Sequence, residues 1–359
     1  MANIPANPEP YRPDLEVVAE DEAKTQQELM ETMLSISHKV YEDSGHAHRS
    51  VHSKSHGLLK VDVEVLDNLP EPLAQGVFAA PRRYEGVLRF STIPGDILPD
   101  TVSTPRGAAL KLLAVDGERL PGAEGDRDQD FVMVNGKKFA APNAKAFLKN
   151  LKLLAATTDK IEGIKVALSG ALRGIEKLVE KTGHESALVK SLGGEPETNI
   201  LGESFFSQLA LRHGRYIAKY ALIPRSPNLT SLTKELVDIG HDDNAIRSAV
   251  QRFFETETGE WSLQAQLCAD IDSMPIEDAT AEWDEGVSPF VTIARVIAVP
   301  QNAWSDARST AVDDGMGFAP WHGLTDHQPL GSIMRARRLS YDRAQRFRSE
   351  HNATAVRSP

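Results

Sequence analysis

Short stretches of alternating apolar and polar residues recur along this chain of 359 residues, and they restrict its possible folds more than any other feature. Residues 58–66 read LLKVDVEVL, and such period-two alternation is typical of a β-strand with one buried face. On similar grounds strands are predicted at residues 86–93, 107–115, 130–135, 205–211, 216–224, 261–269 and 288–300. Many short strands separated by Gly, Pro and Asp turns favour a closed antiparallel β-barrel.

Helical periodicity marks three further segments, so the predicted fold class is α+β. Apolar residues recur at helical spacing in the segments 21–41, 144–155 and 159–181. No internal repeat and no clear linker divides the chain. We therefore expect a single domain over residues 21–350, with a flexible N-terminal arm at 1–20 and a C-terminal tail at 351–359.

Composition excludes several classes of protein. A formal net charge of −11 argues against general binding to nucleic acid or to anionic membranes. The N-terminus has no apolar core typical of a secretory signal, and no apolar run approaches the ~20 residues of a membrane span. One cysteine, Cys268, excludes an intramolecular disulfide and a cysteine-based metal site, and its alternating neighbourhood indicates a core residue. The expected location is the cytoplasm.

The segment 335–348, RARRLSYDRAQRFR, places an arginine one helical turn before a tyrosine. On a helix, Arg337, Tyr341 and Arg348 project from nearly the same face. A nearby positive charge favours a phenolate, and tyrosinate is one of the axial ligands that proteins use for haem iron. The alternative is a solvated basic helix, because six of the fourteen residues are arginines.

The run GHAHRSVHSKSHG at residues 45–57 contains the second candidate site. His48, His52 and His56 are four residues apart, which on a helix could form a metal site. No carboxylate lies near them in sequence, however, and a strand follows, so a single catalytic histidine, His52, is the better candidate. A surface loop rich in histidine is the remaining alternative.

Polar residues on two predicted strands are the third group. Arg89 and Ser91 point to the same side of an alternating strand, and an inward arginine needs an anionic partner because burial of a lone charge is costly. A salt bridge at the barrel end would satisfy it as well. Asn135 follows an apolar strand and could either bind a small molecule or cap a turn.

Together these motifs resemble those of haem catalases, in the same order along the chain. The matching residues run from about 20 to 348 and comprise Arg49-Ser50-Val51-His52, Arg89-Phe90-Ser91-Thr92, Pro105-Arg106-Gly107, and Arg337 with Ser340-Tyr341 and Arg348. The pattern FxPWHxLxxHxPLGxIxRxR, which begins at Phe318, is most similar to the short catalase-related haem peroxidases, or minimal catalases.

The resemblance implies a role for each matching residue. Tyr341 corresponds to the iron ligand, Arg337 to the arginine that keeps it ionised, and His52 to the acid–base histidine. The other correspondences are Val51 (the apolar neighbour of that histidine), Ser91 (its hydrogen-bond partner), and Arg49, Arg89 and Arg348 (the partners of the haem propionates). Large catalases have Asn-Asn-Thr-Pro where this chain has Val134-Asn135-Gly136-Lys137, so Asn135 is the expected distal amide with a possible offset of one position.

The resemblance also implies the activity. We expect a haem b enzyme that cleaves hydrogen peroxide or organic peroxides through an oxyferryl intermediate and oxidises small organic donors, with weak or moderate catalase activity. The chain ends soon after the tyrosine helix, so we expect an accessible haem and a homodimer or a loose tetramer. The alternatives are an allene-oxide-synthase-like dehydratase of fatty-acid hydroperoxides and a haem-binding protein without catalysis.

Overall fold

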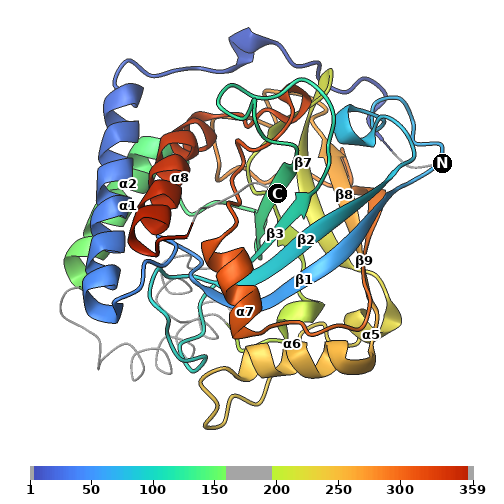
Figure 1. Cartoon of the computed structure of the whole chain (residues 1–359). Coiled ribbons are helices and arrows are strands. Elements are labelled where there is room, and N and C mark those ends of the chain that lie inside the picture. Colours follow the sequence, from blue (N-terminus) through green and yellow to red (C-terminus); the bar gives the residue numbers. More distant parts are fainter. Residues whose placement is uncertain (1–3, 159–195, 355–359) are drawn as a thin grey trace, which may run out of the picture.

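The structure is a computed structural model that describes residues 4–158 and 196–354, with side chains omitted for 153–158. Its strands form a closed antiparallel barrel of eight strands, which confirms the predicted fold class (Figure 1). The strand order is β5-β4-β3-β2-β1-β9-β8-β7, and pairing of β5 with β7 closes the barrel. The strands are β1 (Lys54–Val65), β2 (Arg83–Thr92), β3 (Arg106–Leu112), β4 (Gln129–Val134), β5 (Phe205–Phe206), β7 (Tyr216–Pro224), β8 (Gly259–Leu267) and β9 (Val291–Ala298).

The predicted strand at 205–211 is where the structure differs most from the pattern. Strand β5 ends at Phe206, and the chain resumes as β6 (Leu211–His213), which forms an antiparallel hairpin with β7. Gln208 lies between them with a φ of 60°, a left-handed conformation that cannot continue an extended strand. Its side-chain amide donates to the carbonyls of Gly136 and Lys138, which hold it there.

Three helices lie together beside the barrel: α1 (Glu22–Ser44), α2 (Ala144–Thr158) and α8 (Ser332–His351) (Figure 1). Helix α1 ends at Gly45, whose φ of 72° suits a residue without a β-carbon. The predicted helix at 159–181 lies outside the described residues. The remaining short helices are η1 (Pro13–Leu15), η2 (Gly76–Phe78), η3 (Ile200–Gly202), α5 (Pro227–Thr230), α7 (Asp306–Ser309), the π-helical turn η4 (Thr310–Asp314) and η5 (Thr325–His327).

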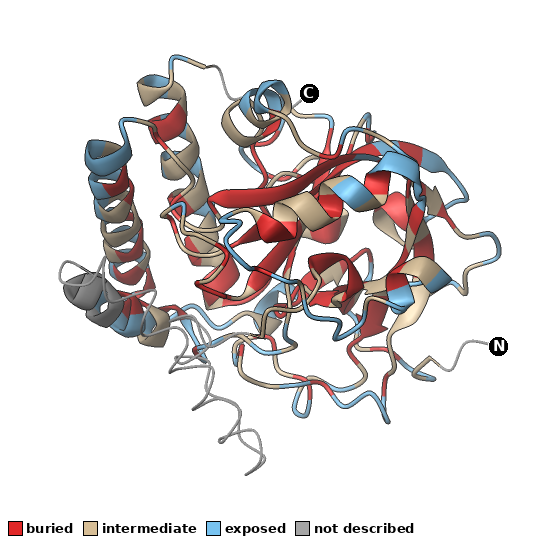
Figure 2. Cartoon of the chain, turned by 90° about the horizontal axis from the view of Figure 1, so that it is seen from below, coloured by how far each residue is buried: buried red, intermediate tan, exposed pale blue. Residues whose placement is uncertain are grey.

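Helix α6 (Ala245–Thr256) was not predicted, although it carries buried residues at helical spacing. Ile246, Val250 and Phe254 are buried, and the helix packs on β1. A β-carbon at Gly57 would lie 3.0 Å from Val250 Cγ1, so the glycine permits this close approach of strand and helix. Figure 2 shows that buried residues gather on the strands and on the helix faces turned toward them.

The segment predicted to be a flexible N-terminal arm contacts the barrel at residues 9–11. The Glu9 and Tyr11 amides donate to the carbonyls of Cys268 and Arg215, each over 2.8 Å. Cys268 itself is buried, and burial raises the pKa of its thiol to about 12. No helix among the described residues is long and apolar enough to cross a membrane.

Arg335 ties this N-terminal segment to α8. Its guanidinium forms ion pairs with Glu16 at 2.6 Å, Glu22 at 2.7 Å and Glu277 at 2.9 Å. Burial alone would lower the pKa of Arg335, but the three carboxylates raise it above its ordinary value. Part of the predicted basic helix is therefore an internal charge cluster rather than a solvated face.

A hydrogen-bonded chain of His213, Tyr220 and His327 is buried in the protein core. His213 Nε2 faces the Leu73 carbonyl at 3.1 Å, and His327 Nε2 faces the Val77 amide at 3.1 Å. These contacts make His213 Nδ1 an acceptor and His327 Nδ1 a donor. Tyr220 Oη bridges them, because it donates to His213 over 2.7 Å and accepts from His327 over 3.0 Å.

Tyr220→Phe is expected to reduce the free energy of unfolding by about 2–4 kcal/mol, because the change leaves one buried acceptor and one buried donor without a partner. Urea denaturation of the purified protein measures this loss. The matched control is Tyr84→Phe, since the Tyr84 hydroxyl donates only one bond, over 3.1 Å to the Val77 carbonyl. That control is expected to cost about 0.5–1.5 kcal/mol. Equal losses for the two variants would contradict the bridging role of Tyr220.

Candidate functional site

A cavity lies between the barrel and the helix group, and its empty space is about 680 Å³ when the open solvent at its mouth is included. Its walls come from the loop before β1, strands β2 to β4, helices α1 and α8, and the segment at Gly317 and Phe318. Seven predicted site residues line it: Arg49, Val51, His52, Arg89, Ser91, Tyr341 and Arg348. The structure thus gathers into one cavity residues that are almost 300 positions apart in the sequence.

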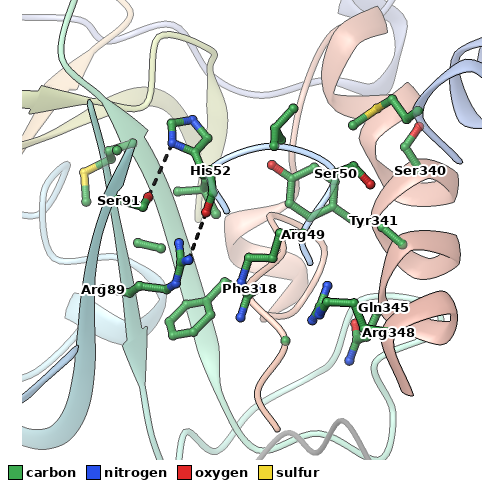
Figure 3. A pocket seen from close by; sticks show the side chains of 18 of the residues that line it. Arg49, Ser50, His52, Arg89, Ser91, Phe318, Ser340, Tyr341, Gln345 and Arg348 are labelled. Atoms are coloured by element: carbon green, nitrogen blue, oxygen red, sulfur yellow. Dashed lines mark hydrogen bonds between the residues drawn. The ribbon is translucent and has the colours of Figure 1, made fainter. Parts of the chain in front are cut away.

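His52 and Tyr341 enter this cavity from opposite sides (Figure 3). His52 precedes β1, whereas Tyr341 projects from α8 with Ser340, Ala344 and Arg348 on the same helix. A phenol opposite an imidazole, with open space between them, can hold a flat ligand that presents one face to each group.

The imidazole of His52 has a defined orientation. Its Nδ1 lies 3.4 Å from Ser91 Oγ, at the long end of hydrogen-bond distances. Gly107 pairs with Ser91 across β2 and β3, and a β-carbon there would come within 2.7 Å of the imidazole ring. Glycine is therefore required for the ring to lie over the strand.

His52 is neutral at ordinary pH. Burial, followed by the charges of Arg89, Arg337 and Arg49, lowers the pKa of its imidazole to about 3. A neutral imidazole can accept a proton from a bound substrate and return it. Burial and the neighbouring cations thus keep the ring uncharged, with a nitrogen free to accept a proton.

Arg49, Arg89 and Arg348 form a guanidinium cluster at one end of the cavity. Arg49 Nη2 donates to the carbonyls of Val312, Asp313 and Met316, over 2.9–3.1 Å. Burial, followed by the charge of Arg89, lowers the pKa of Arg348 to about 10, and burial with the two neighbouring guanidinium groups lowers that of Arg49. The cluster therefore has an excess of positive charge.

The cluster has unused donors that an acidic ligand could satisfy. Among the described residues, Arg49 Nε and Arg348 Nε are buried and have no hydrogen-bond partner. Buried donors without partners are costly, so such atoms in a cavity indicate a place for an anion. Apolar residues, among them Met33, Val132, Met133 and Phe318, supply much of the remaining wall. These features fit haem b, which has a flat apolar body and two carboxylate groups.

Arg337 and Asn135 do not line the cavity. Arg337 lies on α8, one turn before Tyr341. Its Nη1 is 3.7 Å from Met334 Sδ, and its guanidinium is 5.6 Å from the centre of the Phe139 ring. Asn135 Oδ1 accepts from the Arg106 amide over 2.7 Å, and its Nδ2 donates to Glu203 over 2.6 Å.

Asn135 therefore holds the end of β4 to the start of β3. This placement agrees with the turn-capping alternative and not with the expected distal amide. The lining residues of β4 are instead Val132 and Met133. An offset of one position does not restore an amide, because position 134 is valine.

The metal-binding alternative for His48, His52 and His56 is not supported. Strand β1 begins at Lys54, so a spacing of four residues does not place the three side chains on one helical face. His56 is buried, and its Nε2 contacts Thr92 Oγ1 at 3.0 Å. Among the described residues, no group of three or more His, Cys, Asp or Glu side chains is arranged to hold a metal ion.

Other cavity residues were not singled out from the sequence. Met33 belongs to the apolar side of α1, and its periodicity could not separate a cavity wall from ordinary core. Gln345 lies on the predicted helix one turn after Tyr341, so helical spacing could have identified it. Asp313 does not line the cavity but pairs with Arg89 at 2.7 Å, and it had no distinguishing signal beside its neighbour Asp314.

Comparison with known proteins identifies the fold. No family model and no curated protein matches the sequence. The structure is similar to a fungal catalase (TM-score 0.59, 16% identity, 90% of this chain and 65% of that one). It is also similar to catalase A from Saccharomyces cerevisiae (TM-score 0.59, 16% identity, 96% and 68%) and to a bacterial catalase (0.55, 17%, 97% and 64%).

The class that these observations define is the catalase fold, with a cavity beside the barrel. At 16–17% identity the likeness is one of fold, and the chain spans about two thirds of the length of these catalases. The activity must therefore be argued from the chain's own cavity.

Proposed function

We propose that this protein is a haem-dependent oxidoreductase that cleaves hydrogen peroxide or organic peroxides and oxidises small organic donors. The observation that carries the proposal is the placement of His52 and Tyr341 on opposite sides of one cavity, beside guanidinium donors without partners. The catalase fold supports it. The proposed unit is the single domain of residues 21–350.

Each side of the cavity would hold one part of haem. Tyr341 would supply the phenolate ligand to iron, with Arg337 one turn away on the same helix. Arg49 and Arg348 would pair with the propionates through forked, charge-assisted hydrogen bonds. Bound haem would supply the redox-active iron for cleavage of the O–O bond.

His52 would perform the proton transfer. Its neutral imidazole would take a proton from the near oxygen of peroxide and return it to the far oxygen, so that water or an alcohol leaves. Ser91 would orient the ring through Nδ1, and Gly107 leaves room for it. Val51 and Val132 would limit the water around the reacting atoms.

The position of Asn135 bears on the balance of activities. No carboxamide reaches the His52 side of the described cavity lining, since its one carboxamide, Gln345, comes from α8. Without a carboxamide to donate a hydrogen bond beside His52, a second hydrogen peroxide would be held less well in line. We therefore propose that oxidation of organic substrates exceeds oxygen release. The apolar walls equally favour an organic hydroperoxide as substrate, and dehydration of a fatty-acid hydroperoxide is the second candidate.

The test is the optical spectrum of the haem-loaded protein before and after addition of peroxide. A spectrum that changes with peroxide and returns when a phenolic donor is added would support the peroxidase. Return with peroxide alone and release of oxygen would indicate a catalase instead. Consumption of a fatty-acid hydroperoxide without any donor would indicate the dehydratase. Failure to bind haem would refute the proposal.

Tyr341→Phe is expected to remove the phenolate ligand and to weaken haem binding by at least tenfold, with loss of the tyrosinate-type spectrum. Titration of the apoprotein with haem measures both effects. The control is Tyr41→Phe, since Tyr41 lies on α1 near Phe347 and His351 and outside the cavity lining. An unchanged spectrum in Tyr341→Phe would show that another group binds the iron.

A further inference from the structure

Asp313, in the π-helical turn η4, places a carboxylate inside the guanidinium cluster. Its Oδ1 accepts from Arg89 Nε over 2.7 Å, and its Oδ2 accepts from Ser55 Oγ over 2.6 Å and Ser309 Oγ over 2.8 Å. Burial alone would raise the pKa of Asp313, but Arg89 and Arg49 lower it below its ordinary value. The carboxylate is therefore charged, with donors on both oxygens.

Arg89 connects this carboxylate to the main chain at His52. Its Nη2 donates to the His52 carbonyl over 2.9 Å (Figure 3). The same nitrogen donates to the Ser53 carbonyl over 3.1 Å, while Nε bonds to Asp313. The side chain of Arg89 is only 3% exposed. Three of its five N–H groups are thus used within the protein, and its charge already has a counter-ion.

The backbone that Arg89 holds is strained. His52 has a φ of 56°, in the left-handed region that residues with a β-carbon rarely adopt. Such a conformation persists only where surrounding contacts hold it. The contacts here include those from Arg89 to the two carbonyls, a bond of 3.1 Å from the Ser53 amide to the Pro94 carbonyl, and bonds from Ser53 Oγ to the carbonyls of Arg49 and Gly95.

We propose that Asp313 is a positioning residue that acts through Arg89 to hold His52 in its left-handed conformation, and so aims the imidazole into the cavity. Arg89 is then part of the scaffold, and the acidic groups of the ligand pair with Arg49 and Arg348. Within the guanidinium cluster, the buried Nε atoms without a partner belong to Arg49 and Arg348 and not to Arg89, which agrees with separate roles for these arginines. The ligand part of this inference rests on the proposed haem site, whereas the backbone part does not.

Hydrogen exchange in the full-length protein without haem tests the backbone part. In Asp313→Asn, exchange of the Ser53 amide is expected to quicken by at least tenfold, because the neutral amide no longer fixes Arg89. The matched control is Asp314→Asn, which removes the same charge from the next residue. Asp314 instead contacts His46 Nε2 at 3.0 Å, so its replacement should leave Ser53 unchanged.

Two further variants keep this test decisive. Asp313→Glu should restore part of the protection, because it restores the charge. Ser309→Ala removes one of the hydrogen-bond donors to the Asp313 carboxylate, so it should cause a smaller rise in the exchange rate of the Ser53 amide. This variant replaces Asp313→Asn in the test if Asp313→Asn does not fold. Unchanged exchange at Ser53 in Asp313→Asn, or in Ser309→Ala when it alone folds, would overturn the proposal.

A comparison of haem with haem dimethyl ester tests the ligand part. The double variant Arg89→Met/Asp313→Asn removes one charge of each sign, so the net charge of the cluster is unchanged. Its preference for haem over the ester should stay within about threefold of that of the original protein, whereas Arg348→Met should reduce this preference at least tenfold. A tenfold fall in the double variant would show that Arg89 binds the ligand's carboxylates and would overturn its scaffold role.

These outcomes separate the two proposals. If the original protein binds neither haem nor its ester, the proposed function fails, and the exchange of Ser53 still decides whether Asp313 positions His52. If haem binds and exchange is unchanged, the positioning role fails while the proposed function stands.

Discussion

Replacing His52 with alanine is expected to slow peroxide cleavage by about 100- to 10,000-fold, the usual contribution of a positioned acid–base group. Haem binding should stay within about threefold, because His52 lies across the cavity from Tyr341 and outside the guanidinium cluster. Stopped-flow absorbance after mixing with peroxide measures the rate, and titration with haem measures the binding.

Ser91→Ala is the matched comparison for His52→Ala. The Ser91 hydroxyl contacts the imidazole over a long 3.4 Å, so its loss should slow cleavage much less than loss of the ring. If His52→Ala retained most of the activity, the acid–base assignment would be wrong. A haem-storage protein would bind haem equally well with and without His52, since storage needs no proton transfer.

Replacing Lys111 with methionine is expected to cost about 3–5 kcal/mol of unfolding free energy, because it removes the cation that lies between two buried carboxylates. Lys111, Asp128 and Asp130 all have fully buried side chains, and the lysine forms ion pairs with both aspartates. Burial alone would lower the pKa of Lys111, but Asp130 and Asp128 raise it. Urea denaturation at neutral pH measures the loss.

An exposed ion pair provides the control for Lys111→Met. Arg127 and Asp116 lie 2.7 Å apart with side chains 67% and 64% exposed, so Arg127→Met should cost less than about 1 kcal/mol. A similarly small loss for Lys111→Met would show that the buried carboxylates become protonated at little cost. The buried group of Lys111, Asp128 and Asp130 also contacts the cavity wall, because Asp130 Oδ2 accepts a hydrogen bond from the Ala319 amide, next to Phe318.

Most of the barrel could be predicted because period-two alternation reports directly on a strand with one buried face. The predicted strand at 216–224 has the bounds of β7, and the predictions for β1 to β4, β8 and β9 differ from the structure only at their ends. The interrupted strand at β5 could not be predicted. Its break depends on bonds from Gln208 to main-chain carbonyls about 70 positions away.

The helical part was predicted less completely. Helices α1, α2 and α8 were expected from their apolar periodicity or residue spacing, whereas α6 was not assigned. Arg335 illustrates why the exposure of a helix is hard to infer. Its neighbours in sequence left a solvated basic face as the alternative, but three carboxylates from distant segments surround it.

The sequence by itself determined the strands, the helix that carries Tyr341 and Arg348, and the shared side of Arg89 and Ser91, because local periodicity decides which side chains share a face. Only the tertiary structure decided that Asn135 caps a turn, that Met33 and Phe318 line the cavity, and that Asp313 pairs with Arg89. Those outcomes depend on which groups meet across the fold. A charge or an amide is the same in sequence whether its partner is water, the main chain or a ligand.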